Sequence, residues 1–182
     1  MIKNIGILLF CLIFSLGSDA QCKITQIKNA DGSMFLSTEN NLMYQTSKKK
    51  LVERLATDNE NYFLEILPIP FLPKPAGSKV KNDLTVKLSN QKSYTLKHFD
   101  SRYLDKDSSF SILYLFNSKD IPDFKQYKIS SIVLNDGTAE NATYKLVLHP
   151  DAIQKQLTCI NNMRRSAPNT LASTTLWVCQ PP

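Results

Sequence analysis

Histidine and cysteine are scarce in this chain, and their spacing excludes the usual structural metal site. The 182 residues include two histidines and four cysteines. A structural zinc ion normally takes four Cys or His ligands that come in closely spaced pairs, and no two of these residues form such a pair. The chain also lacks a nucleotide-binding loop, a catalytic signature and an internal repeat. We therefore expect neither a metal nor any other cofactor.

The apolar run near the N-terminus is too short for a membrane span. It covers residues 5–16 and stops at Gly17, whereas a transmembrane helix needs about 20 apolar residues. Lys3 before the run and a small residue, Ala20, after it are typical of a secretory signal peptide. We predict a signal peptide at residues 1–20, cleavage near Ala20, and a protein exported to the periplasm, the outer envelope or the extracellular space.

Positive charge exceeds negative charge, but the basic residues are not gathered into a nucleic-acid site. The formal net charge is +6, which favours an anionic partner such as envelope polysaccharide or lipid headgroups. Lysines 48–50 lie between two short apolar-patterned runs and are interpreted as a solvated hairpin tip. Without aromatic residues interleaved among the basic ones, the chain has no platform on which bases would stack. We expect no nucleic-acid partner.

Three cysteines remain after removal of the leader, so one of them has no partner within the chain. Export to an oxidising compartment favours a disulfide over a catalytic thiol. We favour a bond between Cys159 and Cys179, which would close a loop of about 20 residues and contribute roughly 3 kcal/mol to stability. Cys22 would then be free, lipid-modified or bonded between chains, although its spacing equally allows a bond to either of the other two.

Alternation of apolar and polar residues dominates the rest of the sequence. Residues 84–88 and 94–98 alternate around a polar turn and predict a hairpin with one buried face. Residues 62–67 have apolar side chains on both sides, and residues 110–116 are apolar nearly throughout, so both segments are predicted to be well-covered strands. Residues 118–127 are predicted to form one or two helical turns.

A change of period at Pro150 predicts one C-terminal helix. Apolar residues then recur at helical spacing, and Arg164 and Arg165 lie where cations stabilise a helix end. Many strands followed by one helix predict a mainly β fold, an antiparallel β-sandwich or partly open barrel with a C-terminal α-helix at about residues 150–163. The remaining length suits a single domain over residues 21–182, with a tail after the helix.

Prolines cluster in residues 68–75, where they fix the backbone and remove donors. We expect an extended, polyproline-like segment at a sheet edge in place of an interior strand. Its apolar residues Ile69, Phe71 and Leu72 form a candidate contact surface, because a stiff segment loses little entropy when a partner docks. The alternative interpretation is that these side chains cover one end of the core.

Catalytic arrangements receive little support from the residue spacing. A thiol–histidine pair would need Cys159 and the distant His98 to meet by folding. His98 and Asp100 alternate on one strand and are predicted to share a face. Glu65 interrupts an apolar run and is interpreted as pointing outward at an edge. The carboxylates from which a glycosidase pair might be drawn are Glu53, Glu60, Glu65, Asp100, Asp105, Asp107 and Asp136.

These observations favour a non-enzymatic binding or interaction module of the cell envelope or the extracellular space. Its partner would be an envelope protein or an anionic glycan or lipid surface. One alternative is an envelope hydrolase that acts on glycan or ester substrates, and another is a structural envelope component anchored or cross-linked through Cys22. The layout is similar to that of small exported proteins of Gram-negative bacteria, a resemblance that assigns no functional residue.

Overall fold

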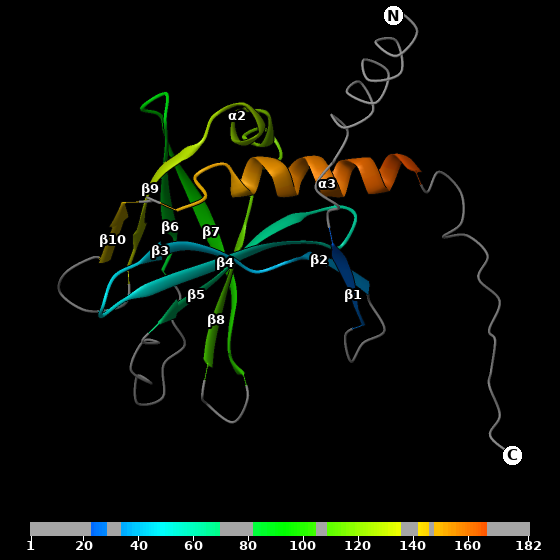
Figure 1. Cartoon of the computed structure of the whole chain (residues 1–182). Helices are drawn as coiled ribbons and strands as arrows, with labels where there is room; N and C mark the ends of the chain where they lie inside the picture. The colour runs from blue at the N-terminus through cyan, green and yellow to red at the C-terminus, as the bar shows by residue number, and fades with distance from the viewer. Residues whose placement is uncertain are drawn as a thin grey trace, which may run out of the picture.

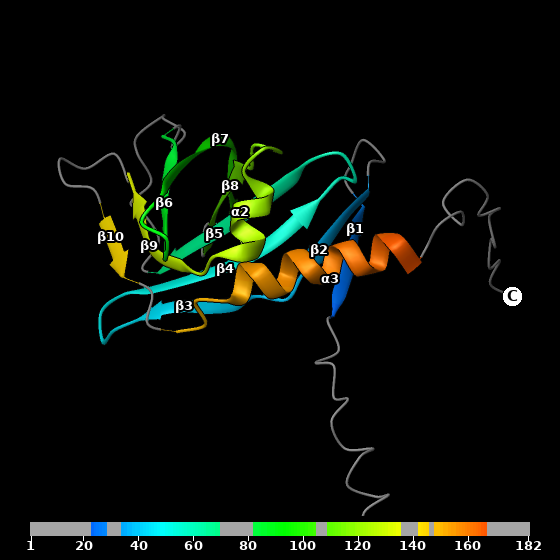
Figure 2. The same cartoon turned by 90° about the horizontal axis from the view of Figure 1, so that it is seen from above.

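The computed structural model describes residues 23–28, 34–69, 82–104, 109–135, 142–145 and 148–166. Within them the chain forms one ten-stranded antiparallel sheet that is not closed. The strands are β1 (Ile24–Lys28), β2 (Met34–Thr38), β3 (Asn41–Gln45), β4 (Lys50–Thr57), β5 (Tyr62–Ile69), β6 (Leu84–Leu88), β7 (Ser93–Leu104), β8 (Ser109–Leu115), β9 (Ile129–Leu134) and β10 (Ala142–Lys145). Their order is β1-β2-β4-β5-β8-β7-β6-β9-β10, and β3 pairs with β4 beside β2. The edge strands β1 and β10 lie at opposite ends of the sheet (Figures 1 and 2).

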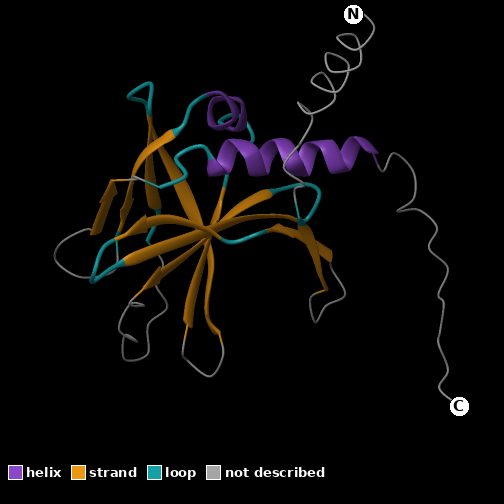
Figure 3. Cartoon of the chain, viewed as in Figure 1, coloured by secondary structure: helices purple, strands orange, loops and turns teal. Residues whose placement is uncertain are grey.

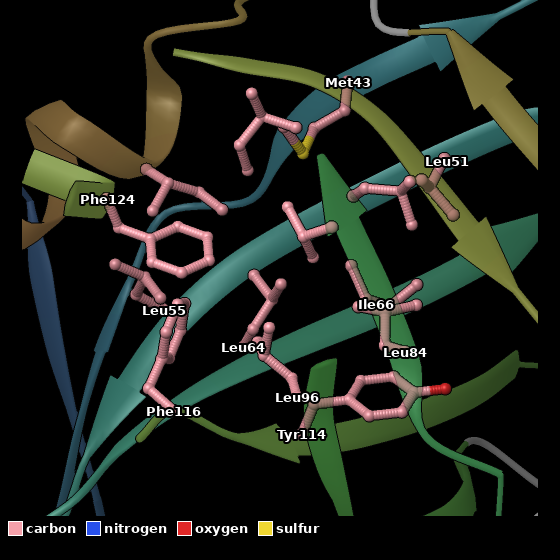
Figure 4. Packing of buried hydrophobic residues seen from close by; sticks show 14 of the residues in the cluster. Met43, Leu51, Leu55, Leu64, Ile66, Leu84, Leu96, Tyr114, Phe116 and Phe124 are labelled. Atoms are coloured by element: carbon pink, nitrogen blue, oxygen red, sulfur yellow. The ribbon is translucent and has the colours of Figure 1, made fainter. Parts of the chain in front are cut away.

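Two described helices, α2 (Ile121–Gln126) and α3 (Ala152–Ser166), lie on one side of this curved sheet (Figure 3). We call the sheet face toward them the inner face and the opposite one the outer face. The core fills the space between the inner face and the helices and includes Leu64, Ile66 and Tyr114 from the sheet (Figure 4). Phe124 of α2 and Leu157 of α3 close it from above. The fold is mainly β, with an open sheet and a C-terminal helix, as the residue pattern predicts.

The central strands are those with apolar residues on both sides. β5 lies between β4 and β8, and β8 lies between β5 and β7. In β5, Leu64 and Ile66 belong to the inner core, whereas Phe63 is equally buried but points to the other face. The two-sided apolar pattern of residues 62–67 therefore predicted an interior strand correctly.

Turn chemistry fixes the hairpins. The lysine segment is the tip between β3 and β4, where the backbone N–H groups of Lys48 and Lys49 donate to the Thr46 hydroxyl at 3.3 and 2.9 Å. The predicted hairpin of residues 84–98 is β6 paired with β7. Its turn places Gln91 at φ 70°, a left-handed conformation in which glycine is usual.

The proline segment begins differently from the expectation. Pro68 and Ile69 are not an excursion at a sheet edge but the last two residues of β5, paired with Leu51 and Lys50 of β4. Pairing of β5 with β8 ends at Ile66. A residue without an N–H is tolerated there because, among the strands that the structure describes, β5 has only β4 as a neighbour at that point. The remaining prolines of the segment lie outside the described residues.

Side-chain bonds hold the helices in place over the sheet. Asp123 of α2 accepts hydrogen bonds from the hydroxyl of Tyr94 and, at 3.1 Å, from the ammonium of Lys92. The hydrogen bond to the Asp123 carboxylate raises the pKa of Tyr94 to about 12. On α3, Asn161 accepts a bond of 2.8 Å from the Tyr62 hydroxyl. Both helices are therefore tied to strands that are distant in sequence.

Candidate functional site

An aromatic cluster lies on the outer face, away from both described helices. It consists of Phe35 of β2, Phe63 of β5 and Phe99 of β7. The ring centroids of Phe35 and Phe63 are 5.5 Å apart, and those of Phe63 and Phe99 are 4.8 Å apart. Phe63 is only 1% exposed, whereas Phe99 is 56% exposed. The exposed Phe99 ring is thus supported by the buried Phe63 ring.

A β-bulge places Phe99 in this position. The register between β7 and β8 shifts between His98 and Asp100, so that His98 pairs with Tyr114 and Asp100 with the adjacent Leu113. Phe99 is the extra residue, and bulges commonly re-aim a side chain. Because Tyr114 and Leu113 point to opposite faces, His98 and Asp100 do so too. The prediction that these two residues share a face is therefore wrong, because simple alternation does not hold across a bulge.

Next to the aromatic cluster, a polar row crosses the outer face. Arg54 of β4 forms an ion pair with Glu65 of β5, and the Ser111 hydroxyl of β8 donates to the same carboxylate. Glu65 is 2% exposed although it lies in a central strand on the outer side. It points outward as predicted, but not at an edge and not into water. The ion pair and the hydroxyl compensate for its burial.

Two basic residues of β7 lie on the same outer face as the aromatic cluster. Arg102 of β7 pairs across the strands with Ser111 and therefore lies on the outer face. It is exposed and forms no ion pair with any residue that the structure describes. Lys97, opposite Leu115, forms an exposed ion pair of 2.6 Å with Asp83. The outer face thus carries an exposed ring and two basic side chains.

A second group of polar residues lies on the inner face, beneath α3. Glu53 is completely buried between Leu51 and Leu55 of β4, with the side chains of Asn41 and Gln156 as its polar neighbours. Burial raises the pKa of Glu53 to about 8, and these two amides offset the shift only partly. Neither oxygen of Glu53 forms a well-aligned hydrogen bond. A carboxyl group in this environment is neutral at pH 7.

Tyr114 is a third buried polar group. Its ring meets the His98 ring edge to face at 6.2 Å, and its hydroxyl has no hydrogen-bond partner within the described part of the chain. Burial is the main cause that raises the pKa of Tyr114, and the carboxylate of Asp83 adds to it. The hydroxyl therefore stays protonated and can only act as a donor or a neutral acceptor.

Cys159 is buried on α3 and is disulfide-bonded. The cysteine to which it is bonded lies outside the described part of the chain. Cys22 and Cys179 both lie there. The Cys159–Cys179 bond therefore remains a prediction. A thiol–histidine pair at Cys159 does not fit this state, because a bonded sulfur is not a nucleophilic thiolate.

The predicted contact surface lies only partly within the described residues. Ile69 ends β5 and is 49% exposed, on the same outer face as Glu65, whereas Phe71 and Leu72 fall outside. Phe99 was not among the contact residues predicted from the sequence. Its neighbours Lys97, His98 and Asp100 are polar, and a lone phenylalanine among polar residues is the one signal that might have marked it.

The two fully buried carboxylates do not form a glycosidase pair. Glu53 and Glu65 are the fully buried carboxylates among the described residues, and they lie on opposite faces of the sheet. They therefore cannot flank one glycosidic bond. Across the described ranges, no three His, Cys, Asp or Glu residues are grouped so that they could hold a metal ion. Neither α2 nor α3 has the length and apolar character of a membrane span.

In comparisons with known proteins, no family model, curated protein or solved structure shows significant similarity to this chain.

Proposed function

We propose that this chain is an exported, non-enzymatic binding module of the cell envelope or the extracellular space. The outer face of the sheet is its contact surface, with Phe99 at the centre. The observation that supports this most directly is the 56% exposure of a phenylalanine whose ring packs against that of a buried one. Isolated apolar residues on a surface are ordinary, but an aromatic ring held by a bulge over a rigid base is typical of an interface anchor.

The partner is proposed to be an envelope protein that offers an apolar side chain next to acidic residues. The apolar part would cover Phe99 and the exposed edge of Phe35, where burial of aromatic surface provides affinity. The acidic part would meet Arg102 and the lysines around the sheet, consistent with a net charge of +6. Ile69, at the far end of β5, would extend the contact along the outer face.

Photo-crosslinking in the secreting cell tests this proposal. A benzophenone side chain is introduced at position 99 or, as a matched control, at Met163, which is 39% exposed on the helix side. We expect a discrete protein adduct from position 99 only, and we expect excess wild-type protein, but not F99S, to compete for it. Equal adducts at both positions, or competition by F99S, would contradict the proposed surface.

Binding to an anionic surface would give a different result. Vesicles that contain an anionic phospholipid would then bind the protein in a salt-sensitive way, R102Q would weaken binding, and F99S would leave it unchanged. That outcome would replace the protein partner by a lipid or glycan surface.

Export is tested separately by the intact mass of the protein recovered from the medium or periplasm. We expect a chain that begins at Gln21. A mass that includes Met1 would contradict export through a cleaved leader, and an added lipid mass would identify an anchored protein.

A further inference from the structure

A buried carboxyl group lies at the contact between α3 and the sheet. Glu53 of β4 is 0% exposed and stands on the inner face between Leu51 and Leu55, which line the core (Figure 4). Its cross-strand neighbours are Asn41 on β3 and Ile66 on β5. Neither of its oxygens accepts a hydrogen bond of good geometry. This position belongs to neither the outer face nor the proposed contact with a partner.

The side chain of Gln156, on α3, lies next to the Glu53 carboxyl group. It is 5% exposed, and its amide nitrogen donates to the backbone carbonyl of Glu39 at 3.1 Å. Its amide oxygen accepts no hydrogen bond. The side chains of Gln156 and Asn41 are the two polar groups that act on the Glu53 carboxyl. Three buried acceptor atoms, two on Glu53 and one on Gln156, are therefore short of donors.

Counting donors and acceptors decides the protonation state. An ionised Glu53 could only accept, for instance from the Asn41 amide, and the Gln156 oxygen also only accepts, so the Gln156 oxygen would remain unsatisfied in the core beside a buried charge. A protonated Glu53 has one O–H to donate. That single proton satisfies the Gln156 oxygen, and the second Glu53 oxygen can then accept from the Asn41 amide.

We propose that Glu53 carries a proton in the folded protein and donates it to the Gln156 amide oxygen, so that a proton joins α3 to strands β3 and β4. Neutral side chains face this carboxyl from each element packed against it, namely Asn41 from β3, Ile66 from β5 and Gln156 from α3. Of the charged residues of α3, Arg165 is exposed in the last turn, and Lys155 and Arg164 are engaged elsewhere. Lys155 pairs with Asp151 at 2.9 Å, and Arg164 bonds the Tyr62 hydroxyl at 3.1 Å.

The proton makes the attachment of α3 dependent on pH. Burial raises the pKa of Glu53 from its ordinary 4.5 to about 8 in the folded chain. Between these values the folded state holds one more proton than the unfolded state, so stability falls as pH rises. The contribution is complete below about pH 4.5 and is lost as the pH rises through about 8.

Denaturant unfolding at several pH values tests the proposal with the near-isosteric variant E53Q. The amide that this substitution introduces can still donate to Gln156 but does not titrate. We expect the wild-type folding constant to lose up to about tenfold per pH unit, relative to E53Q, between about pH 5 and 8. E60Q, which changes an exposed glutamate, should follow the wild type. Parallel curves for the wild type and E53Q would overturn the proposal.

Infrared spectroscopy keeps the proposal testable if E53Q does not fold. Wild-type protein with isotope-labelled glutamate should show the carbonyl band of one protonated carboxyl group at pH 6.5, and this band should disappear with a midpoint near pH 8. Replacing the acceptor by leucine, Q156L, should shift the band because the hydrogen bond is lost. A spectrum with carboxylate bands alone at pH 6.5 would refute the protonated state.

Discussion

Glu53 and Glu65 lie in neighbouring strands but point to opposite faces of the sheet. Glu53 stands opposite Ile66, and Glu65 stands opposite Arg54. Both carboxyl groups are buried, yet only Glu65 has a cation and a hydroxyl beside it. The same residue type therefore occupies two environments, beside a cation on the outer face and without one on the inner face, because each position supplies different partners.

The ion pair on the outer face predicts a penalty when one partner is removed. R54M leaves the Glu65 carboxylate buried without its cation, and we expect a loss of about 2 kcal/mol at pH 7, less than a fully buried pair would give because the Arg54 side chain is 22% exposed. Urea unfolding at pH 7 measures the loss.

The double variant R54M/E65M provides the control for this prediction. It removes both charges and replaces them with side chains of similar length, so its stability should return to within about 1 kcal/mol of the wild type. An R54M protein as stable as the wild type would mean that Glu65 does not depend on its neighbour.

Local patterns were enough to predict most of the fold, but not the main surface feature. Alternation identified the β6–β7 hairpin, and two-sided apolar runs identified β5 and β8 as interior strands. The bulge at Phe99 could not be predicted, because it arises from the register between strands and no glycine marks it. Pro68 gave a misleading signal, since the sequence does not reveal that β5 loses one neighbour after Ile66.

The partner of Cys159 can be identified by peptide mapping of unreduced protein. After loss of the leader the candidates are Cys22 and Cys179. Loop length favours Cys179, which would close a loop of about 20 residues. We therefore expect a Cys159–Cys179 peptide, which would leave Cys22 free, lipid-modified or bonded between chains.

Removal of this bond should reduce stability. We expect C159S to lose about 3–5 kcal/mol, the range for disulfides that close loops of moderate to great length. A Cys22–Cys159 peptide in the map would contradict the expected pairing and exclude a lipid at Cys22.

The turn between β6 and β7 offers a stabilising substitution. Gln91 has φ 70°, which is unfavourable for a residue with a Cβ atom. We expect Q91G to raise the free energy of unfolding by about 0.5–1 kcal/mol, since relief of strain outweighs the added freedom of the unfolded chain. Thermal unfolding measures the gain. N90G, one residue earlier, is the matched control and should not stabilise.

Paired substitutions in the aromatic cluster separate its structural role from its contact role. Phe63 is buried, so F63A should cost about 3–5 kcal/mol through lost burial and a cavity. Phe99 is 56% exposed, so F99A should cost only about 1 kcal/mol, mainly from the lost contact between the two rings. Unfolding curves at one pH compare the two. A loss from F99A as large as that from F63A would show that Phe99 serves the fold, and the outer face would then lose its central contact residue.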